Sequence, residues 1–343
     1  MKYKASVIGI GQIGHEIDKD LTRKFIWSHT KAYYSNPLIE LVAISDINSD
    51  LRQNFEKDYP QVKAYKNYIN MLQENKIQIV SICIPTILHL KIIKEIVQQF
   101  NSIKAIFIEK PVGSNHQEAV EIENICRKNN IVLASNYMRR WDFKYKHAQE
   151  IINSEDLGKV QTIVAYGATS LLTSASHLVD LVLFFGGKVK WIVGELQEDY
   201  VRRVSNVEDH GGVAFMKFKG HGHGFLKATS INDENFMFEI DILLEKGRIS
   251  IVESWDDDDQ SIMRIMKFKP RNSDKTGKYK TLRKDNNSVL NSNERMIDAV
   301  SDIIKCINNG KIPHSSGENA IEVHQIIESI KLSSGSNQKI IQL

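Results

Sequence analysis

The first third of the chain alternates between short apolar runs and amphipathic stretches. In the amphipathic stretches at 88–100 and 116–129, apolar positions recur with the period of a helix. The apolar runs are hydrophobic on both faces, as are strands of a parallel sheet that helices cover on both sides. These runs lie at 4–10, 38–46, 78–85, 104–111 and 131–137. Their order predicts a doubly wound α/β domain with a parallel sheet over residues 1–135.

From residue 136 onward, apolar and polar positions alternate, which is typical of antiparallel strands with one face toward solvent. The alternating segments lie at 159–168, 189–197, 212–220, 223–231 and 236–252. Glycines in KGHGHG and EKG indicate hairpin turns, and helical patterns at 294–310 and 317–334 close the chain. We interpret the polar stretch 270–288 as a surface loop or an edge strand. Residues 136–343 are therefore predicted to form an α+β domain with a large, open, mainly antiparallel sheet.

Composition and charge narrow the class of protein. The 343 residues are 42% hydrophobic and 25% charged, with a net charge of +3, which is ordinary for a globular chain and too small to demand a nucleic-acid partner. No apolar run reaches the roughly 18 residues of a membrane span. The scattered Cys83, Cys126 and Cys306 indicate neither a disulfide framework nor a zinc site. We expect a cytoplasmic protein with no nucleic-acid and no membrane partner.

Three glycines with GxGxxG spacing, Gly9, Gly11 and Gly14, follow the first apolar run. In a dinucleotide-binding domain the first glycine ends the strand and the second lets a phosphate approach the backbone. The third packs against a helix whose N-terminal N–H groups face that phosphate. Gln12 and Ile13 complete the turn, so all five residues are candidate cofactor contacts. Alone, the spacing is weak evidence, because a tight structural turn also uses glycines.

Asp46 strengthens the dinucleotide interpretation. It ends the second apolar run, where an acidic residue receives the ribose hydroxyls of the cofactor. Its distance from Gly14 exceeds the usual spacing of about 20 residues, so we expect an insertion within 20–33. A carboxylate at this place repels a 2′-phosphate, which favours NAD, while the nearby Arg52 keeps NADP as the alternative.

Two more strand ends lie at the edge where a doubly wound sheet presents its ligands. They contribute Ile84, Pro85, Thr86 and His89 from CIPTILH, and Glu109 and Lys110 from IEKPVG, as candidate cofactor contacts. Thr86 is predicted to cap the helix that follows. Pro111 holds Lys110 in an extended conformation and so fixes where it points. Without the sheet around it, Lys110 would be read as a surface lysine at a turn.

Taken together, these motifs resemble the glucose-fructose oxidoreductase, inositol dehydrogenase and MocA (Gfo/Idh/MocA) family. The matching segments are GIGQIG, SHTKAY with ELVAISD, CIPTILH, EKPVG, NYMRRWD, SASHLVDLVLFFGG and IPHSSGENAIEVHQIIESI. The resemblance implies an N-terminal Rossmann domain and a C-terminal α/β domain with an open antiparallel sheet. It also implies NAD(P)-dependent oxidation or reduction of a sugar, polyol or related carbinol, with Lys110 as a catalytic and substrate-binding group and His177 as a second catalytic group.

The chemistry of these residues agrees with that resemblance. Oxidising a carbinol requires a group that takes the hydroxyl proton, and a partly buried lysine beside an oxidised nicotinamide is pushed toward its neutral form. The stretch TSASHLVDLVLFFGG is predicted to be a helix that begins with N-cap residues and places His177 and Asp180 on one face. The alternative is a capping histidine with a solvated carboxylate.

One position departs from the family pattern. Many of these dehydrogenases carry an aspartate four residues before the histidine, where this chain has Thr173. A threonine can hydrogen-bond a substrate but cannot carry charge or act as a base at neutral pH. We therefore expect Lys110 and His177 to share the proton transfer, with Thr173 and Asp180 as substrate contacts.

NYMRRWD adds Asn136, Arg139 and Arg140 as candidate substrate contacts, because arginines bind phosphate or carboxylate groups. Salt bridges that lock the two domains together are an equally weighted alternative.

Other charged segments are interpreted as surface. The histidines of GHGHG, His221 and His223, fit a glycine-rich hairpin turn better than a metal pair, and no metal site is predicted. The acidic run Asp256–Asp259 lacks the calcium-loop pattern. Arg202 with Arg203 and the basic stretch 267–284 suit either a nucleotide-linked sugar or a solvated face.

The sequence thus predicts an enzyme that transfers a hydride between NAD, or NADP, and a carbinol or carbonyl of a sugar, a sugar derivative or a polyol. Two alternatives are NAD-assisted glycoside cleavage and a dinucleotide-binding sensor or scaffold without turnover. The expected partners are a small sugar-like substrate and further copies of the same chain. An exposed apolar sheet face in the second domain predicts a homodimer or homotetramer.

Overall fold

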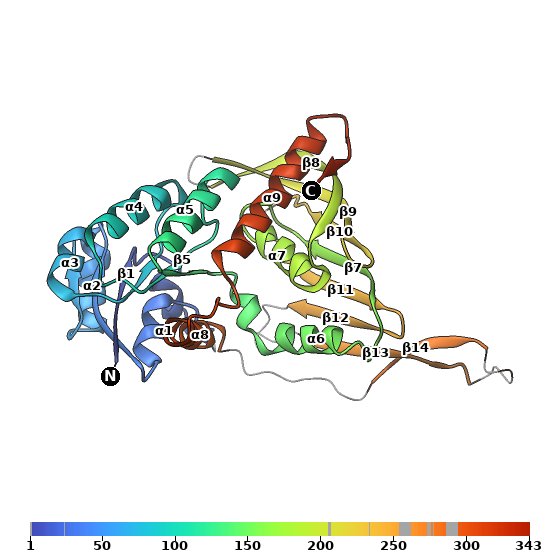
Figure 1. The fold of residues 1–343 in the computed structure, drawn as a ribbon, viewed down its shortest axis with the longest axis horizontal. Coiled ribbons are helices and arrows are strands. Elements are labelled where there is room, and N and C mark those ends of the chain that lie inside the picture. The colour runs from blue at the N-terminus through green and yellow to red at the C-terminus, as the bar shows by residue number, and fades with distance from the viewer. Residues whose placement is uncertain are drawn as a thin grey trace. The chain divides into compact units, whose positions relative to one another are not determined.

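The computed structural model of the chain describes residues 2–23, 25–204, 207–232, 234–253, 262–272, 276, 278–285 and 294–343. Contacts along the chain divide it into two compact units, which Figure 1 shows as ribbons. Unit 1 comprises Met1–Asp142 and Asn293–Ile321, and unit 2 comprises Phe143–Ser292 and Glu322–Leu343.

Unit 1 is built on a six-stranded parallel sheet of order β3-β2-β1-β4-β5-β6, as the doubly wound prediction requires. The strands are β1 (Tyr3–Ile8), β2 (Ile39–Ser45), β3 (Lys63–Tyr65), β4 (Ile79–Ile82), β5 (Ala105–Ile108) and β6 (Val132–Ser135). All the predicted strands are confirmed. The edge strand β3 was not predicted because its three residues, KAY, are too few to show a pattern.

Five helices in the described part of unit 1, α1 to α5, connect these strands in turn, and a sixth, α8, comes from far along the chain. They are α1 (His29–Ser35), α2 (Ser49–Asp58), α3 (Tyr68–Asn75), α4 (His89–Gln99), α5 (His116–Lys128) and α8 (Arg295–Asn309), with 3₁₀ turns η1 (Glu16–Lys19), η2 (Thr86–Leu88) and η3 (Met138–Trp141). Asn48, Asn67 and Asn115 each cap the helix that follows by accepting its first backbone N–H groups.

The contacts assign residues 136–142 and α8 to unit 1, whereas the sequence pattern places the domain boundary after residue 135. The turn η3 packs on α8, and Trp141 Nε1–H donates to Asp302 Oδ2 at 2.9 Å. Met296 and Ile303 of α8 are fully buried in the same core as the strands β1 and β5. A helix far along the chain thus completes the core of unit 1, which no local pattern reveals.

The helix predicted directly after Gly14 is interrupted. His29 N–H donates to Ile13 O at 3.2 Å and Thr30 N–H donates to Gly14 O at 3.1 Å. In a regular helix, residue 17 would donate to Ile13 O, so His29 takes the place of residue 17 and the residues between them loop out before α1 resumes. The insertion expected within 20–33 is therefore a loop inside the first helix. Asp18 closes its base by accepting from Trp27 N, Ser28 N and Ser28 Oγ.

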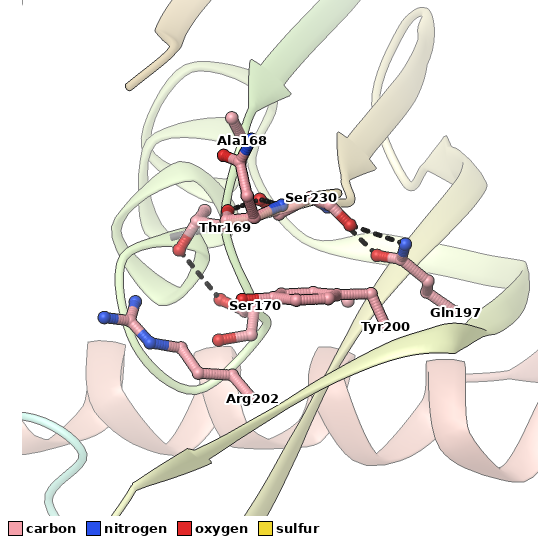
Figure 2. A pocket seen from close by; sticks show the side chains of 9 residues that line it. Ala168, Thr169, Ser170, Gln197, Tyr200, Arg202 and Ser230 are labelled. Carbon is pink, nitrogen blue, oxygen red and sulfur yellow. Dashed lines mark hydrogen bonds between the residues drawn. The ribbon is translucent and has the colours of Figure 1, made fainter. Parts of the chain in front are cut away.

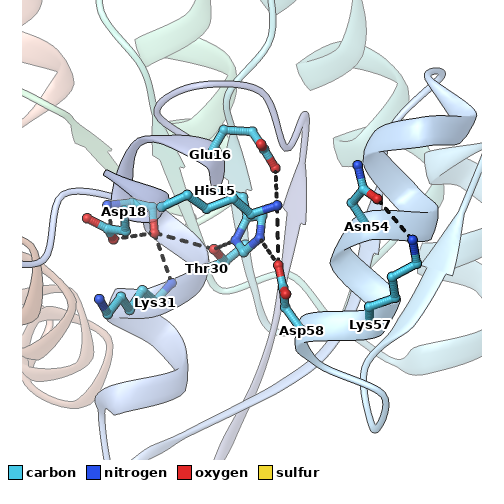
Figure 3. Close-up of polar contacts among 10 residues, drawn as sticks. His15, Glu16, Asp18, Thr30, Lys31, Asn54, Lys57 and Asp58 are labelled. Carbon is cyan, nitrogen blue, oxygen red and sulfur yellow. Dashed lines mark hydrogen bonds and ion pairs between the residues drawn. The ribbon is translucent and has the colours of Figure 1, made fainter. Parts of the chain in front are cut away.

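A polar cluster fastens the start of this loop to α2 (Figure 3). His15, 5% exposed, lies 3.0 Å from Thr30 Oγ1 and 3.4 Å from Asp58 Oδ2. Lys19 pairs with Asp58 at 3.2 Å and with Glu16 at 2.9 Å. Burial lowers the pKa of His15, because desolvation outweighs the attraction of Asp58.

Unit 2 is built on a nine-stranded sheet of order β14-β13-β12-β11-β7-β10-β9-β8-β15. Within this sheet, only β7 and β10 pair in parallel among the described strands, so the sheet is mainly antiparallel, as predicted. The strands are β7 (Val160–Gly167), β8 (Val189–Val204), β9 (Val207–Phe218), β10 (His223–Ala228), β11 (Phe238–Leu244), β12 (Gly247–Glu253), β13 (Ile262–Pro270), β14 (Lys280–Lys284) and β15 (Ile341–Gln342). The polar stretch 270–288 contains β14, which is an edge strand.

The helices of unit 2 cover one face of this sheet, and they are α6 (Phe143–Asn153), α7 (Ala175–Gly186) and most of α9 (Gly317–Ser334). α7 packs on β7 and β10, and Ser333 of α9 accepts the Gly194 N–H of β8 at 3.0 Å. No helix in the described part of the chain is long and apolar enough to cross a membrane.

Candidate active site

The three glycines of the turn meet different constraints. Gly9 has a φ of +86°, and a Cβ there would lie 2.4 Å from the Cys83 carbonyl oxygen. A Cβ on Gly14 would lie 2.1 Å from the Gly9 carbonyl oxygen. At Gly11, by contrast, no atom of the described residues other than Gly11 and its two chain neighbours lies within 4 Å of the Cβ position. The backbone at Gly11 therefore faces open space, which is the approach that a pyrophosphate needs.

The end of β2 is tied to this turn by Asp46. Its carboxylate accepts from Ile10 N at 2.9 Å and from Asn48 N at 2.8 Å. Arg52 donates to the Asp46 carbonyl oxygen at 2.8 Å, so its guanidinium also lies at this strand end. A carboxylate and a guanidinium therefore lie together at the end of β2, the strand end at which dinucleotide-binding domains recognise the ribose.

The end of β4 differs from the prediction at Thr86. Thr86 opens the 3₁₀ turn η2 and makes no side-chain capping bond, because this turn intervenes between the strand and α4. Ile84 and Pro85 form the connection. His89 is fully buried, with its ring nitrogens 2.9 Å from Ile84 O and 3.1 Å from Val112 O. Its imidazole joins the loop after β4 to the loop after β5.

Glu109 and Lys110 follow β5 directly. The Glu109 carboxylate receives Asn136 Nδ2 at 2.5 Å and lies 2.9 Å from His29 Nε2. Lys110 N–H donates to Glu109 Oε2 at 3.3 Å, and the Lys110–Pro111 peptide bond is cis. Burial works to raise the pKa of Glu109, but the hydrogen bonds from His29 and Asn136 and the charge of Lys110 hold it below its usual value. An ionised carboxylate therefore stands beside Lys110.

The segment after β6 buries its polar residues. Asn136 is 1% exposed, and Arg139 and Arg140 are each 6% exposed. Arg140 donates to the His314 carbonyl oxygen at 3.4 Å. Within the part of the chain that the structure describes, no donor reaches Asn136 Oδ1. This buried amide oxygen is an acceptor available to a ligand.

In unit 2, the predicted helix over TSASHLVDLVLFFGG is α7, and Gly187 with a φ of +73° follows it. His177 and Asp180 are 7% and 1% exposed, so the alternative of a solvated Asp180 carboxylate does not hold. Ser174 occupies the N-cap position but makes no side-chain capping bond.

Asp209 of β9, a residue that sequence reasoning missed, organises the turn before α7. Its carboxylate accepts from Leu172 N at 2.8 Å, Thr173 N at 3.0 Å and Ser170 Oγ at 2.8 Å. Thr173 Oγ1 lies 2.8 Å from Ser170 Oγ. The position of the Thr173 backbone is thus set by a carboxylate 36 residues away along the chain, and no local pattern could identify it.

Beside this turn a bulge in β8 builds a small pocket (Figure 2). Between Leu196 and Val201 the register shifts, which places Gln197 and Tyr200 against Ser170 and Ser230. Gln197 already donates to the Ser230 carbonyl oxygen at 2.7 Å and accepts from Ser230 N at 3.0 Å. The free space is about 20 Å³, room for roughly one water. The pocket takes a single substituent at most.

Of the histidines of GHGHG, His221 lies in the hairpin turn between β9 and β10, as expected, and His223 begins β10. His221 lies 3.2 Å from Lys159 Nζ, and His223 stacks on Phe215. No three metal-ligating side chains gather anywhere among the described residues. The acidic run Asp256–Asp259 lies outside those residues.

Two family models match the chain. One, described as an oxidoreductase family with an NAD-binding Rossmann fold, matches residues 3–137. The other, described as the C-terminal α/β domain of the same oxidoreductase family, matches residues 165–342.

Individual relatives align over parts of their length. An uncharacterized oxidoreductase of Schizosaccharomyces pombe is 31% identical over 102 residues, 30% of this chain and 27% of that protein. The chain therefore spans well under half of this relative. A myo-inositol 2-dehydrogenase of Thermotoga maritima is 20% identical over 227 residues, 61% of this chain and 66% of that protein.

Solved structures share the fold over the whole chain. The WlbA dehydrogenase from Bordetella pertussis, crystallised with NADH and UDP-GlcNAcA, superposes with a TM-score of 0.75 at 17% identity. The match covers 100% of this chain and 99% of that one.

Proposed function

This chain belongs to the Gfo/Idh/MocA family of NAD-binding oxidoreductases, and on that premise we propose that it is a sugar dehydrogenase or reductase. It transfers a hydride between nicotinamide and a carbinol or carbonyl of a sugar, polyol or sugar derivative, including nucleotide-linked sugars. The observation that carries the proposal is the pair of residues after β5, an ionised Glu109 with Lys110 beside it. They follow a strand on the nicotinamide side of the sheet's switch point between β1 and β4.

The residues at the strand ends fit a dinucleotide. Gly11 leaves open space at the turn, and Gln12 and Ile13 complete a backbone surface for the pyrophosphate. Asp46 serves the adenosine ribose, while Ile84, Pro85 and Thr86 line the connection after β4. His89 is assigned a supporting part, because both of its ring nitrogens are held by the main chain. The bound cofactor supplies the hydride acceptor or donor.

Side chains of the protein carry out the proton transfer. Lys110 accepts the hydroxyl proton when the substrate is oxidised and returns it during reduction. His177 shares this transfer or hydrogen-bonds a substrate hydroxyl, and Asp180 orients it. Thr173 contributes a hydroxyl rather than a charge.

Substrate recognition is assigned to Asn136, Arg139 and Arg140 together with the residues above. The Asn136 amide oxygen accepts from a ligand hydroxyl or amide. Buried arginines favour a substrate that carries a carboxylate or phosphate group.

A substrate panel tests the activity directly. Sugars, polyols, uronic acids and nucleotide-linked sugars are incubated with the protein and NAD⁺, and NADH is followed by absorbance. Accumulation of NADH with one class supports the dehydrogenase. Cleavage of a glycoside without net NADH assigns the NAD-assisted alternative instead, and NADH binding without turnover on any class assigns the sensor.

We expect NAD(H) to bind more tightly than NADP(H), because the Asp46 carboxylate repels a 2′-phosphate. Asp46→Ala removes this charge while Arg52 stays at the strand end. The difference in affinity between NAD(H) and NADP(H) should therefore become smaller. Fluorescence titration of both cofactors measures it. Asp50→Ala, which removes a neighbouring exposed carboxylate without contact to the glycine turn, serves as the control. Equal or tighter binding of NADP(H) by the unaltered protein contradicts the assignment.

We also propose that the open sheet face of unit 2 forms a homodimer or homotetramer interface. Phe225 and Val213 are 45% and 40% exposed, and the rings of Phe225 and Phe215 lie 4.6 Å apart on this face. Light scattering at micromolar concentration should show a dimer or tetramer, and Phe225→Glu should weaken it by burying a charge. Leu21→Glu changes an equally apolar exposed side chain in unit 1 and should have no effect. A monomeric unaltered protein would refute the interface.

A further inference from the structure

We infer that His29 is a positioning residue that holds the Glu109 carboxylate in place and, through it, sets the charge environment of Lys110. The inference rests on the proposed function for the part that Lys110 plays in turnover. Its structural content stands within unit 1 alone. His29 belongs to the SHTKAY segment and is the first residue of α1.

His29 is enclosed in a continuous buried network. Its ring is fully buried and lies against the Phe107 ring at 4.4 Å. Nε2 is 2.9 Å from Glu109 Oε1, and Nδ1 is 2.8 Å from Ser81 Oγ. Ser81 Oγ in turn lies 2.7 Å from Tyr33 Oη. Both ring nitrogens are therefore fixed, one by the strand β4 and one by the carboxylate.

The proton on Nε2 follows from the partner. An ionised carboxylate can only accept hydrogen bonds, so Nε2 carries the hydrogen that it shares with Glu109. Removing a buried carboxylate from water is costly unless donors compensate it. His29 and Asn136 both donate from their side chains to Glu109. Without His29, Glu109 would be driven toward its neutral form or out of its place.

The looped-out segment determines the position of His29 on the first helix. Residues 17–28 interrupt the first helix, yet His29 re-enters with its N–H on Ile13 O. The bonds of Asp18 to Trp27 and Ser28 restore the register immediately before His29. His29 therefore occupies the position that the residue four places after Ile13 would occupy in an uninterrupted helix.

Two nearly isosteric variants separate the two bonds of the ring. A glutamine amide nitrogen reaches the place of Nε2, whereas an asparagine amide reaches only that of Nδ1. His29→Gln therefore keeps a donor for Glu109, and His29→Asn keeps a partner for Ser81 and loses Glu109. His15→Asn is the matched control, since His15 is a buried histidine of the same unit whose partners are Thr30 and Asp58.

The readout is the reactivity of the Lys110 amine, which requires neither substrate nor turnover. The full chain without cofactor is treated with trace acetic anhydride across a range of pH, and acetylation of the Lys110 peptide is quantified by mass spectrometry. Among the described residues, the titratable groups that interact electrostatically with Glu109 are His29, Lys110, His89 and the Cys83 thiol. Loss of the Glu109 charge removes an attraction that favours the ammonium form of Lys110.

In His29→Asn we expect the pH of half-maximal labelling of Lys110 to fall by about one unit, and in His29→Gln and His15→Asn to stay at the unaltered value. On a substrate identified by the panel and assayed in the direction of carbonyl reduction, where the Lys110 ammonium donates the proton, His29→Asn should lower kcat by roughly 10- to 100-fold. NADH affinity should change little, and His29→Gln should restore kcat. Identical labelling curves for His29→Asn and the unaltered protein would overturn the inference. Absence of turnover on every substrate refutes only the proposed function.

A second measurement keeps the inference falsifiable if His29→Asn fails to fold. In protein labelled with nitrogen-15 histidine, the His29 ring signals should move in Glu109→Gln, because their hydrogen-bond partner loses its charge. The His15 signals should not move. Unchanged His29 signals would mean that the ring is not bonded to Glu109, and the inference would fail.

Discussion

Lys110→Met should abolish most turnover while leaving cofactor binding nearly intact. Methionine keeps the length and the apolar stem but removes the amine that exchanges the proton. Loss of a positioned acid–base group typically lowers a rate by about 10²–10⁴-fold. The pyrophosphate turn lies at Gly9–Gly14, after a different strand, so NADH affinity should change little. Steady-state rates on an identified substrate, read beside NADH titration, measure both quantities.

Two comparisons make this result specific. Lys104→Met replaces the lysine directly before β5, at the opposite end of the strand from Lys110. It should change neither turnover nor NADH affinity. His177→Asn should cost less than Lys110→Met if His177 only orients the hydroxyl, and nearly as much if it shares the proton. Near-normal turnover of Lys110→Met would contradict the assignment, and loss of NADH binding would mean that Lys110 serves the cofactor instead.

Gly11→Ala should lower NADH affinity and Gly14→Ala should lower the free energy of unfolding, although both glycines belong to one motif. A Cβ on Gly11 meets no atom of the described residues within 4 Å apart from its two chain neighbours, so the free energy of unfolding should hold while the approach of the pyrophosphate is blocked. We expect NADH affinity to fall by about 10- to 100-fold, the equivalent of roughly 1–3 kcal/mol of overpacking. A Cβ on Gly14 would lie 2.1 Å from the Gly9 carbonyl oxygen. Gly14→Ala should therefore lower the free energy of unfolding by about 1–3 kcal/mol.

Thermal unfolding and NADH fluorescence titration separate these outcomes. Gly220→Ala is the control, because Gly220 also has open space around its Cβ position but lies in the β9–β10 turn. It should alter neither quantity. If Gly11→Ala bound NADH normally, the open space at Gly11 would not be the pyrophosphate site.

The periodicity of apolar residues predicted most of the strands and helices of the fold. The five predicted strands of unit 1 and the helices α4 and α5 lie where the apolar pattern indicates, because a residue's neighbours along the chain decide which face it shows. The strand β3 and the 3₁₀ turn at Thr86 escaped the pattern. Each is only a few residues long, and so short a segment shows no period.

The first helix shows where a motif misleads. GxGxxG predicts a turn and a helix, and the turn is present as predicted. The helix resumes only at His29, because Asp18 binds Trp27 and Ser28 and closes a loop that the glycine spacing does not encode.

The sequence by itself determined the chemical groups: the glycine turn, Asp46, the Glu109–Lys110 pair and His177 are readable because each follows an element whose type the local pattern defines. Only the tertiary structure decided what holds them. His29 reaches Glu109 across 80 residues, and Asp209 reaches Thr173 across 36. Such bonds form because buried polar groups must find partners wherever the packed chain brings them, and sequence separation places no limit on that pairing.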